Sequence, residues 1–317
     1  MTFFTKGFGF IDQYGVQYMN VENIVEKIIS INPSAIFING VCKNSHLIKQ
    51  KLPQSKIYVW NLREIFSNDI NDINSTDCYI FNSRYHANKC EVLPYTKKII
   101  IQDSIPDIFI QNHHFDYFKK TKILVYIGES CECLLLRDIY LTIQTKILDV
   151  KLKIFLPQNS ISENDEIHIK EMTKISGIEI YTKITPSEIF NRCQESMVCL
   201  YPCIFTDTGY TSILEMVYLG CNVITTNIPS ISEVAGEFSE IVNLPFDYDK
   251  QFKENMKKTI ESSELGMDWC QKFANVAIKC INEYNTLDTQ SKINHRIDYI
   301  RENYRWTKQI EKIYDLI

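Results

Sequence analysis

Short apolar runs and amphipathic stripes alternate along the chain. Apolar runs at residues 35–39, 56–60, 78–81 and 98–102 predict strands, and residues 2–5 are a further candidate. Between them, residues 21–31 place aliphatic side chains on one face at helical spacing. Alternating strands and helices predict an α/β fold with a small parallel sheet, which residues 2–5 would begin.

A second pattern covers residues 198–235. An apolar run at 198–201 ends in Pro202, a polar turn follows at 206–210, and a short apolar helix ends at Gly220 before a strand at 222–225. This strand–loop–helix–strand order is typical of a parallel α/β sheet. In such sheets the loop and the helix N-terminus are where phosphate groups bind.

Glu215 lies inside that apolar helix, between aliphatic residues on both sides. An ionised carboxylate in such surroundings is costly unless something hydrogen-bonds it, and the paired hydroxyls of a ribose would do so. Asp207 lies eight residues earlier, in the loop. The alternative is an exposed glutamate on a half-buried helix and an aspartate in a simple turn. The residues alone fit both interpretations.

The stretch YPCIFTDTGYTSILEMVYLGCNVITTNIPSISEVA at 201–235 resembles the nucleotide-sugar signature of group 1 (family 4) retaining glycosyltransferases of the GT-B fold. That signature has an acid, seven residues, a glutamate, and then a Gly-x-x-Val-Ile step. Asp207 and Glu215 match the two acids, and Gly220 begins the step. The first acid is shorter here by one methylene, and Ser212 replaces a proline.

The resemblance extends over segments 77–95, 121–129, 151–158, 177–203, 241–260 and 304–317. It implies two Rossmann-like domains facing each other across a cleft. An acceptor-side domain would span residues 1–112 and a donor-side domain residues 121–290. The polar and aromatic segment 111–120 is the predicted linker. A C-terminal helix at 291–317 would pack back on the N-terminal domain.

The resemblance also implies the site residues. Asp207 and Arg137 would be catalytic, and the donor would be bound by Glu215, Gly209, Tyr210, Thr211, Ser212, Gly128, Lys183 and Ile184. Relatives carry an arginine and a lysine soon after the first donor-domain strand. Here Glu129 replaces the arginine, and no lysine stands at the expected spacing. Arg137 is either the substitute cation or an ordinary arginine on a helix surface.

Composition limits the partners. The 317 residues are 45% hydrophobic and 23% charged, with a net charge of −5, which is ordinary for a globular protein and gives no general attraction to nucleic acid. No apolar run approaches 18 residues and the N-terminus lacks a signal-peptide pattern, so we expect a cytoplasmic protein. Peripheral membrane contact stays open, because many relatives act on lipid-linked acceptors.

The eleven cysteines predict buried free thiols rather than a disulfide framework. Five lie in apolar segments: Cys78, Cys199, Cys203, Cys221 and Cys280. The alternative is a metal site at Cys131-x-Cys133, which has no second pair at zinc-site spacing nearby. We expect no metal and no cofactor beyond the nucleotide-diphosphate sugar that is the donor substrate.

Three functions fit this sequence to different degrees. The first is a retaining glycosyltransferase acting on a glycan, lipid or protein acceptor. The second is a non-catalytic sugar-nucleotide-binding or scaffold subunit, favoured by the missing arginine and lysine. The third is a Rossmann oxidoreductase, disfavoured because no Gly-x-Gly-x-x-Gly follows a strand.

Overall fold

The computed structural model describes residues 2–5, 10–11, 17–20, 24–39, 44–61, 70–89, 96–111, 119–156, 161, 163–204, 211–246 and 264–315. The chain divides into two compact units, residues 1–101 with 316–317, and residues 102–315. This division lies before the predicted boundary at residue 112, because helix α5 (Asp107–Gln111) belongs to the second unit. Most of the predicted linker, residues 112–118, lies outside the described residues.

A four-stranded parallel sheet forms the centre of the first unit. Its strand order is β4 (Ala35–Asn39), β5 (Lys56–Asn61), β6 (Cys78–Phe81) and β7 (Lys97–Ile100). The connecting helices are α1 (Ile24–Ile31), α2 (Ser45–Lys51), α3 (Ile70–Asn74) and α4 (Arg84–Lys89). The four apolar runs therefore form the predicted strands, each within a residue or two of its expected bounds.

The strand predicted at residues 2–5 forms, but not in that sheet. β1 (Thr2–Thr5) pairs in parallel with β3 (Gln17–Asn20), which pairs antiparallel with β2 (Phe10–Ile11). These three strands make a separate sheet. The prediction that β1 begins the four-stranded sheet is therefore wrong. A strand pairs most often with its neighbours in sequence, and here these neighbours were not recognised.

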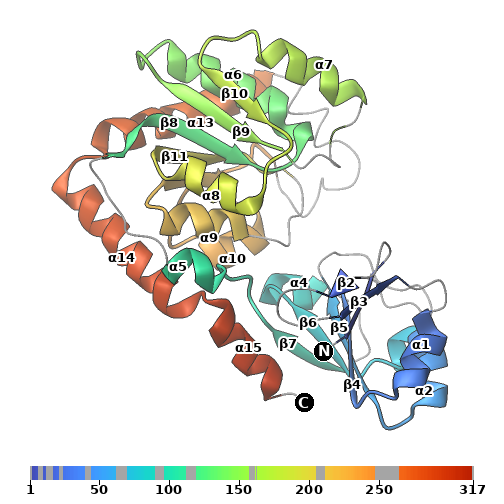
Figure 1. Ribbon diagram of the computed structural model, residues 1–317. Helices are drawn as coiled ribbons and strands as arrows, with labels where there is room; N and C mark the ends of the chain where they lie inside the picture. Colours follow the sequence, from blue (N-terminus) through green and yellow to red (C-terminus); the bar gives the residue numbers. More distant parts are fainter. Residues whose placement is uncertain are drawn as a thin grey trace. The chain divides into compact units, whose positions relative to one another are not determined.

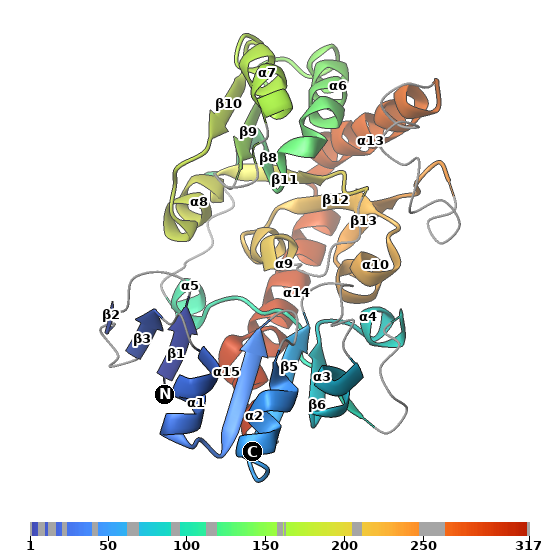
Figure 2. The same cartoon turned by 90° about the vertical axis from the view of Figure 1, so that its right-hand side faces the viewer.

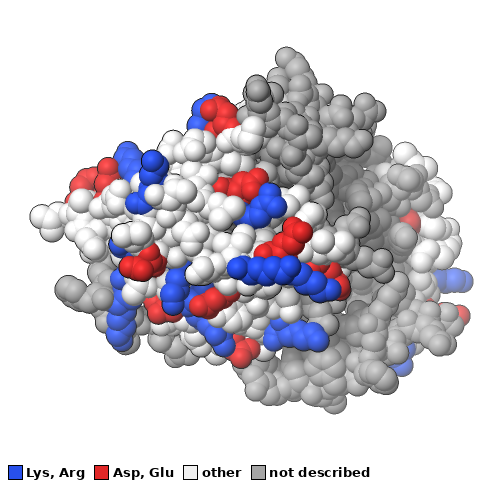
Figure 3. All heavy atoms as spheres, turned by 90° about the horizontal axis from the view of Figure 1, so that it is seen from above, with Lys and Arg blue, Asp and Glu red and all other residues white. Residues whose placement is uncertain are grey.

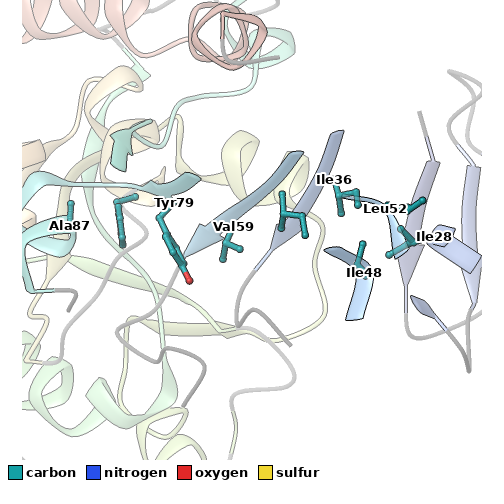
Figure 4. Packing of buried hydrophobic residues seen from close by; sticks show 9 residues of the cluster. Ile28, Ile36, Ile48, Leu52, Val59, Tyr79 and Ala87 are labelled. Carbon is teal, nitrogen blue, oxygen red and sulfur yellow. The ribbon is translucent and has the colours of Figure 1, made fainter. Parts of the chain in front are cut away.

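The core of the first unit lies between the four-stranded sheet and its first helices (Figure 4). Ile28 of α1 and Ile48 of α2 are buried against Ile57, Val59 and Tyr79 of the sheet. The aliphatic stripe of α1 thus faces the sheet, as the helical spacing predicted.

The second unit contains a six-stranded parallel sheet (Figures 1 and 2). Its order is β10 (Ile178–Tyr181), β9 (Lys151–Phe155), β8 (Thr121–Ile127), β11 (Ser196–Tyr201), β12 (Asn222–Thr226) and β13 (Ser239–Val242). Numbered along this unit, the order is 3-2-1-4-5-6, the doubly wound arrangement of dinucleotide-binding domains. The α/β class predicted from the sequence is confirmed in both units.

Helices cover both faces of the six-stranded sheet. They are α6 (Cys133–Gln144), α7 (Glu163–Met172), α8 (Pro186–Cys193), α9 (Thr211–Tyr218), α10 (Pro229–Ala235), α13 (Glu264–Glu283) and α14 (Leu287–Asn303). α6 and α13 pack together on one face, whereas α9 and α14 pack together on the other (Figures 1 and 2). Seen from above, the molecule shows basic and acidic side chains interspersed rather than separated by sign (Figure 3).

Gly220 ends α9, as the sequence predicted. Its φ of 78° is left-handed, a conformation that glycine adopts without steric cost. The amide of Gly220 donates to the carbonyl of Val217, and that of Cys221 donates to Met216, both at 2.9 Å. This pair of bonds is a Schellman motif, which satisfies carbonyls that the helix end would otherwise leave open. The chain then enters β12 directly.

The predicted C-terminal helix consists of two helices, α14 and α15 (Trp306–Tyr314). They are separated at Tyr304 and Arg305, where the backbone of Arg305 is extended and forms an isolated bridge with Ile105. The amide of Ile105 donates to the carbonyl of Tyr304 at 2.9 Å. Sequence periodicity missed this break because its partner lies 200 residues away. The packing of this segment on the first unit stays a prediction.

Asp107 stabilises the same junction between α14 and α15. Its carboxylate accepts from Arg305 Nε at 2.9 Å and from the amide of Thr307 at 3.0 Å, in the first turn of α15. Burial opposes its ionisation, but the bonds from Thr307 and Arg305 outweigh burial and hold its pKa below the ordinary value. The ionised carboxylate therefore stabilises the fold above its unfolded pKa, and this contribution is lost as the pH falls through the folded pKa.

We expect Asp107→Ala to lower the free energy of unfolding of the second unit by about 1–2 kcal/mol at pH 7, the usual cost of a lost N-terminal cap. Denaturant titration followed by circular dichroism measures this change. Asp107→Asn keeps an acceptor for Thr307 but loses the ion pair, so it should lie between the alanine variant and wild type. Equal stability of Asp107→Ala and wild type would show that the junction does not need this carboxylate.

Candidate nucleotide-binding site

The strand order fixes where the second unit can bind a ligand. β8 and β11 are neighbours in the sheet, with Leu124 opposite Val198 and Val125 opposite Cys199. From β8 the chain continues to β9 on one side, and from β11 to β12 on the other. Ligands of open α/β sheets bind outside the carboxyl ends of the strands at such a switch point. The two segments concerned are the turn after β8 and the segment that leads from β11 to α9.

Gly128 lies in the turn after β8, beneath the ring of Tyr126. A Cβ atom at Gly128 would lie 2.3 Å from Tyr126 Oη and 2.6 Å from Cζ. The residue must therefore be glycine for Tyr126 to keep its place. The amide of Gly128 donates to the carbonyl of Phe155 at 3.3 Å, which ties the turn to the end of β9.

Tyr126 also holds the remainder of this turn. Its hydroxyl lies 2.9 Å from the carbonyl oxygen of Glu129 and 2.5 Å from Oε2 of Glu132. Tyr126 is fully buried, and Glu132, in the 3-10 turn η2 (Ser130–Glu132), is 4% exposed. Burial and the adjacent Glu132 raise the pKa of Tyr126 well above its ordinary value. The sequence alone carries no sign of this pair, because a glutamate within Cys-Glu-Cys does not show which side chain its carboxyl group contacts.

The N-terminus of α9 is the second part of the site. Thr211 and Ser212 begin this helix and are half-buried. The first amides of a helix have no partner within it and carry the positive end of its dipole, so they suit an anion. Three of the predicted site residues that precede them, Asp207, Gly209 and Tyr210, lie outside the described residues.

Glu215 lies one turn further along α9. Its neighbours Ile213, Leu214 and Met216 are fully buried, and Glu215 itself is half-buried. Within the described part of the chain its carboxylate makes no hydrogen bond or ion pair. Burial alone raises its pKa from 4.5 to about 7. This setting does not fit the alternative of an exposed glutamate.

The predicted cations of the donor site are more exposed. Arg137 lies one turn into α6, half-exposed, and its Nε pairs with Asp138 at 2.8 Å. Lys183 is exposed and Ile184 half-buried in the loop between β10 and α8. Arg192, near the end of α8, lies over the ring of Tyr181 at 4.8 Å. These residues lie on separate elements: Arg137 on α6, Lys183 in the loop before α8, and Arg192 on α8.

The remaining chemistry in the described residues is sparse. Eight of the cysteines that the structure describes are buried free thiols, and they include the five named from the sequence. In the same residues, no group of three or more His, Cys, Asp or Glu side chains is placed to hold a metal ion. None of the helices described is both long and apolar enough to cross a membrane.

No family model matches this sequence, and no curated protein matches it. Solved structures do match its fold. HepE from Anabaena, solved with UDP and glucose, has a TM-score of 0.65 at 12% identity over 92% of this chain and 80% of its own. Sucrose-phosphate synthase from Thermosynechococcus elongatus has a TM-score of 0.57 at 11% identity, with 99% and 87% covered. A glycosyltransferase from Rickettsia africae has a TM-score of 0.58 at 14% identity, with 95% and 89% covered. The chain thus has the GT-B fold of glycosyltransferases.

Proposed function

We propose that this protein is a retaining glycosyltransferase that moves a sugar from a nucleotide-diphosphate sugar to a glycan, lipid or protein acceptor. The observation that carries the proposal is Glu215, a half-buried carboxylate without a partner among the described residues, on the helix next to the switch point. Ribose hydroxyls would donate to this carboxylate. The occurrence of the same fold in HepE, solved with UDP and glucose, supports this choice of ligand.

The remaining roles follow from what the leaving group needs. When the bond between the anomeric carbon and the diphosphate oxygen breaks, negative charge builds on the diphosphate. The amides of residues 209–212 and the dipole of α9 would stabilise that charge. Asp207 would hold hydroxyls of the transferred sugar, and Gly128 would let the backbone approach it. Lys183 and Ile184 would lie near the nucleobase.

Arg137 would supply the cation that relatives place directly after the first donor-domain strand. Its present partner, Asp138, is a half-exposed neighbour in the sequence. Exposed pairs of this kind contribute little, so the guanidinium is free to exchange Asp138 for a diphosphate. We expect transfer without an added metal ion, and loss of turnover on chelation would contradict that part of the proposal.

A thermal-shift screen against a panel of nucleotide-diphosphate sugars tests the proposed ligand class. A ligand that binds only the folded state raises the unfolding midpoint, by the equivalent of about 2.7 kcal/mol at 100 times its Kd. We expect one nucleotide series to shift the midpoint and its free sugars not to. A panel without any shift would contradict the proposal. The anomeric configuration of the product, read by NMR, then tests retention.

The second candidate is a sugar-nucleotide-binding subunit without catalysis. Glu129 stands where relatives place the arginine, and Glu132 is buried three residues later. Both residues bring acidic groups to the place where the leaving group would need positive charge. Such a subunit would bind the nucleotide sugar through Glu215 and α9 but would not break it down.

A further inference from the structure

Lys120 is a buried lysine at the amino end of the six-stranded sheet. It directly precedes β8 and is only 7% exposed. Its Nζ donates to the carbonyl of Ser196, the first residue of β11, at 2.9 Å, and to the carbonyl of Leu219 at 2.5 Å. Leu219 directly follows α9. One amine therefore joins the first residue of β11 to the C-terminal end of this helix.

A second buried side chain bonds to the same end of α9. Tyr284, which follows α13 and is fully buried, donates its hydroxyl to the carbonyl of Gly220 at 2.7 Å. Sγ of Cys221 donates at 3.3 Å to the carbonyl of Ser196, which Lys120 also uses as an acceptor. Side-chain hydrogen bonds thus attach the C-terminal end of α9 both to β11 and to α13.

The chemistry of Lys120 is unusual for an interior position. Burial lowers the pKa of its amine below the ordinary value, because the interior supports an ammonium less well than water does. A long apolar side chain would fill the same space without removing an amine from water. What the amine adds is a pair of directional hydrogen bonds, and these bonds fix where α9 ends.

We infer that Lys120, together with Tyr284, positions the donor site by holding the C-terminal end of α9. This inference rests on the proposed function, in which the first amides of α9 and Glu215 bind the nucleotide sugar. The amide of Leu219 donates to the carbonyl of Glu215 at 2.9 Å, so the residue that Lys120 holds and the residue that meets the ribose belong to the same helical turn. α9 has eight residues, so its two ends lie about 12 Å apart and move together.

The expected consequence is a tighter donor complex. If α9 could shift in the unliganded protein, binding would have to restrict it, and part of the interaction energy would be used for that ordering. Lys120 lies at the amino end of the sheet, opposite the carboxyl end where ligands of such sheets bind. It is therefore a positioning residue that acts through α9 and does not touch the donor.

Calorimetry on a double-mutant cycle separates positioning from a general loss of stability. Lys120→Met keeps a long unbranched side chain and removes its donors. At pH 8, and well below the denaturation midpoint, we expect it to raise the donor Kd about tenfold, the scale of one or two lost hydrogen bonds. In a Glu215→Gln background it should raise Kd only about threefold or less, because a contact that depends on the position of α9 is already lost. Equal effects in the two backgrounds, or an unchanged Kd in Lys120→Met, would overturn the inference.

Lys153 provides the matched control. It is likewise 7% exposed and lies in β9 of the same sheet, but it donates to the carbonyl of Arg192 in α8 at 3.2 Å and pairs with Glu195 at 2.5 Å. Lys153→Met also removes a buried amine, yet it should leave the donor Kd within about threefold, less than one lost hydrogen bond. A coupling to Glu215 as large as that of Lys120 would assign the effect to lost stability and contradict positioning.

Tyr284→Phe keeps the inference testable if Lys120→Met does not fold. This variant removes one hydroxyl group from the same end of α9 and keeps the ring. We expect it to raise the donor Kd about fivefold, the scale of one lost hydrogen bond, and to do so less in the Glu215→Gln background. An unchanged Kd in Tyr284→Phe would show that the donor site does not depend on this end of the helix.

Hydrogen exchange tests the hold on α9 without any ligand. In Lys120→Met or Tyr284→Phe the amides of residues 211–219 should exchange about tenfold faster than in wild type, whereas those of α8 should not change. Lys153→Met should leave the exchange of α9 as it is. Unchanged exchange of α9 in the first two variants would overturn the inference. If exchange rises as expected but wild type binds no nucleotide sugar, the proposed function and the role for the donor fail, and only the hold on α9 is confirmed.

Discussion

Glu215→Gln is expected to stabilise the unliganded protein at pH 8 and to weaken nucleotide binding at the same pH. A residue kept for folding would lower stability when replaced, and an exposed residue would change neither quantity. We expect the free energy of unfolding to rise and the nucleotide affinity to fall. This is the result for a carboxylate whose burial lowers stability and whose charge binds the ligand.

The stability change follows from the pKa of Glu215, which burial raises from 4.5 to about 7. Between these values the folded state keeps a proton that the unfolded state has lost, so the free energy of unfolding falls as the pH rises. The total loss is about 3 kcal/mol at pH 8, from about 1.4 kcal/mol for each pH unit. Glutamine does not titrate, so the variant should match wild type near pH 4.5 and exceed it progressively up to pH 8.

The binding change has the opposite direction. Ribose hydroxyls bind the ionised carboxylate, and a charge-assisted hydrogen bond contributes about 1.5–3 kcal/mol, or roughly 10-fold to 150-fold in Kd. Wild-type affinity should therefore rise with pH through about 7, and the affinity of Glu215→Gln should not. Calorimetry with the nucleotide sugar found in the screen measures both.

Glu171→Gln provides the matched control, since it makes the same change at an exposed glutamate of α7 in the same unit. It should leave the denaturation midpoint and Kd unchanged. Unchanged nucleotide affinity in Glu215→Gln would mean that its carboxylate does not contact the ligand.

Asp207→Ala is expected to reduce turnover far more than donor affinity. If Asp207 holds sugar hydroxyls that carry more charge as the sugar–phosphate bond breaks, its contact is stronger in the transition state than in the ground state. We expect kcat to fall on the order of 100-fold, the scale of one lost transition-state hydrogen bond in an enzyme site. The Kd of the donor should change by less than about threefold, since the contact that is lost forms mainly in the transition state.

Steady-state kinetics and calorimetry on the same preparation separate these quantities. Arg137→Ala is the companion variant, and it should also reduce kcat if its guanidinium acts on the leaving diphosphate. A rise in KM at constant kcat for Asp207→Ala would assign this aspartate to donor binding instead. Full activity of Arg137→Ala would transfer the leaving-group role to Lys183, Arg192 or a residue of the first unit.

Local patterns predicted much of this fold, and long-range contacts account for the rest. Strands such as β4 and β6 are short apolar runs whose burial does not depend on which strand lies beside them. The end of α9 at Gly220 follows from glycine's own conformational freedom. In contrast, the pairing of β1 with β3 and the break before α15 depend on partners far along the chain or not recognised as strands. The hydrophobic periodicity of a single segment carries no information about such partners.

The candidate site likewise contains features that follow from local sequence and features that depend on contacts between distant segments. The apolar neighbours of Glu215 in sequence made a partly buried carboxylate one of two open interpretations, because one α-helix carries both the glutamate and its surroundings, and the structure decides between them. Glu132 carried no role in the sequence beyond lying between Cys131 and Cys133, since a sequence shows that an acid lies near a helix start but not what its carboxyl group contacts. The contact with Tyr126 became visible only when strand β8 and turn η2 were placed together.

The central claim is that this chain transfers a sugar from a nucleotide donor, and release of nucleoside diphosphate tests it most directly. Wild-type protein would be incubated with the nucleotide sugar that gives the largest thermal shift, with candidate acceptors and with water alone. We expect nucleoside diphosphate to appear in step with glycosylated acceptor and slowly with water alone. Tight donor binding without any release, under every acceptor condition, would contradict the claim and leave a binding subunit on the same fold.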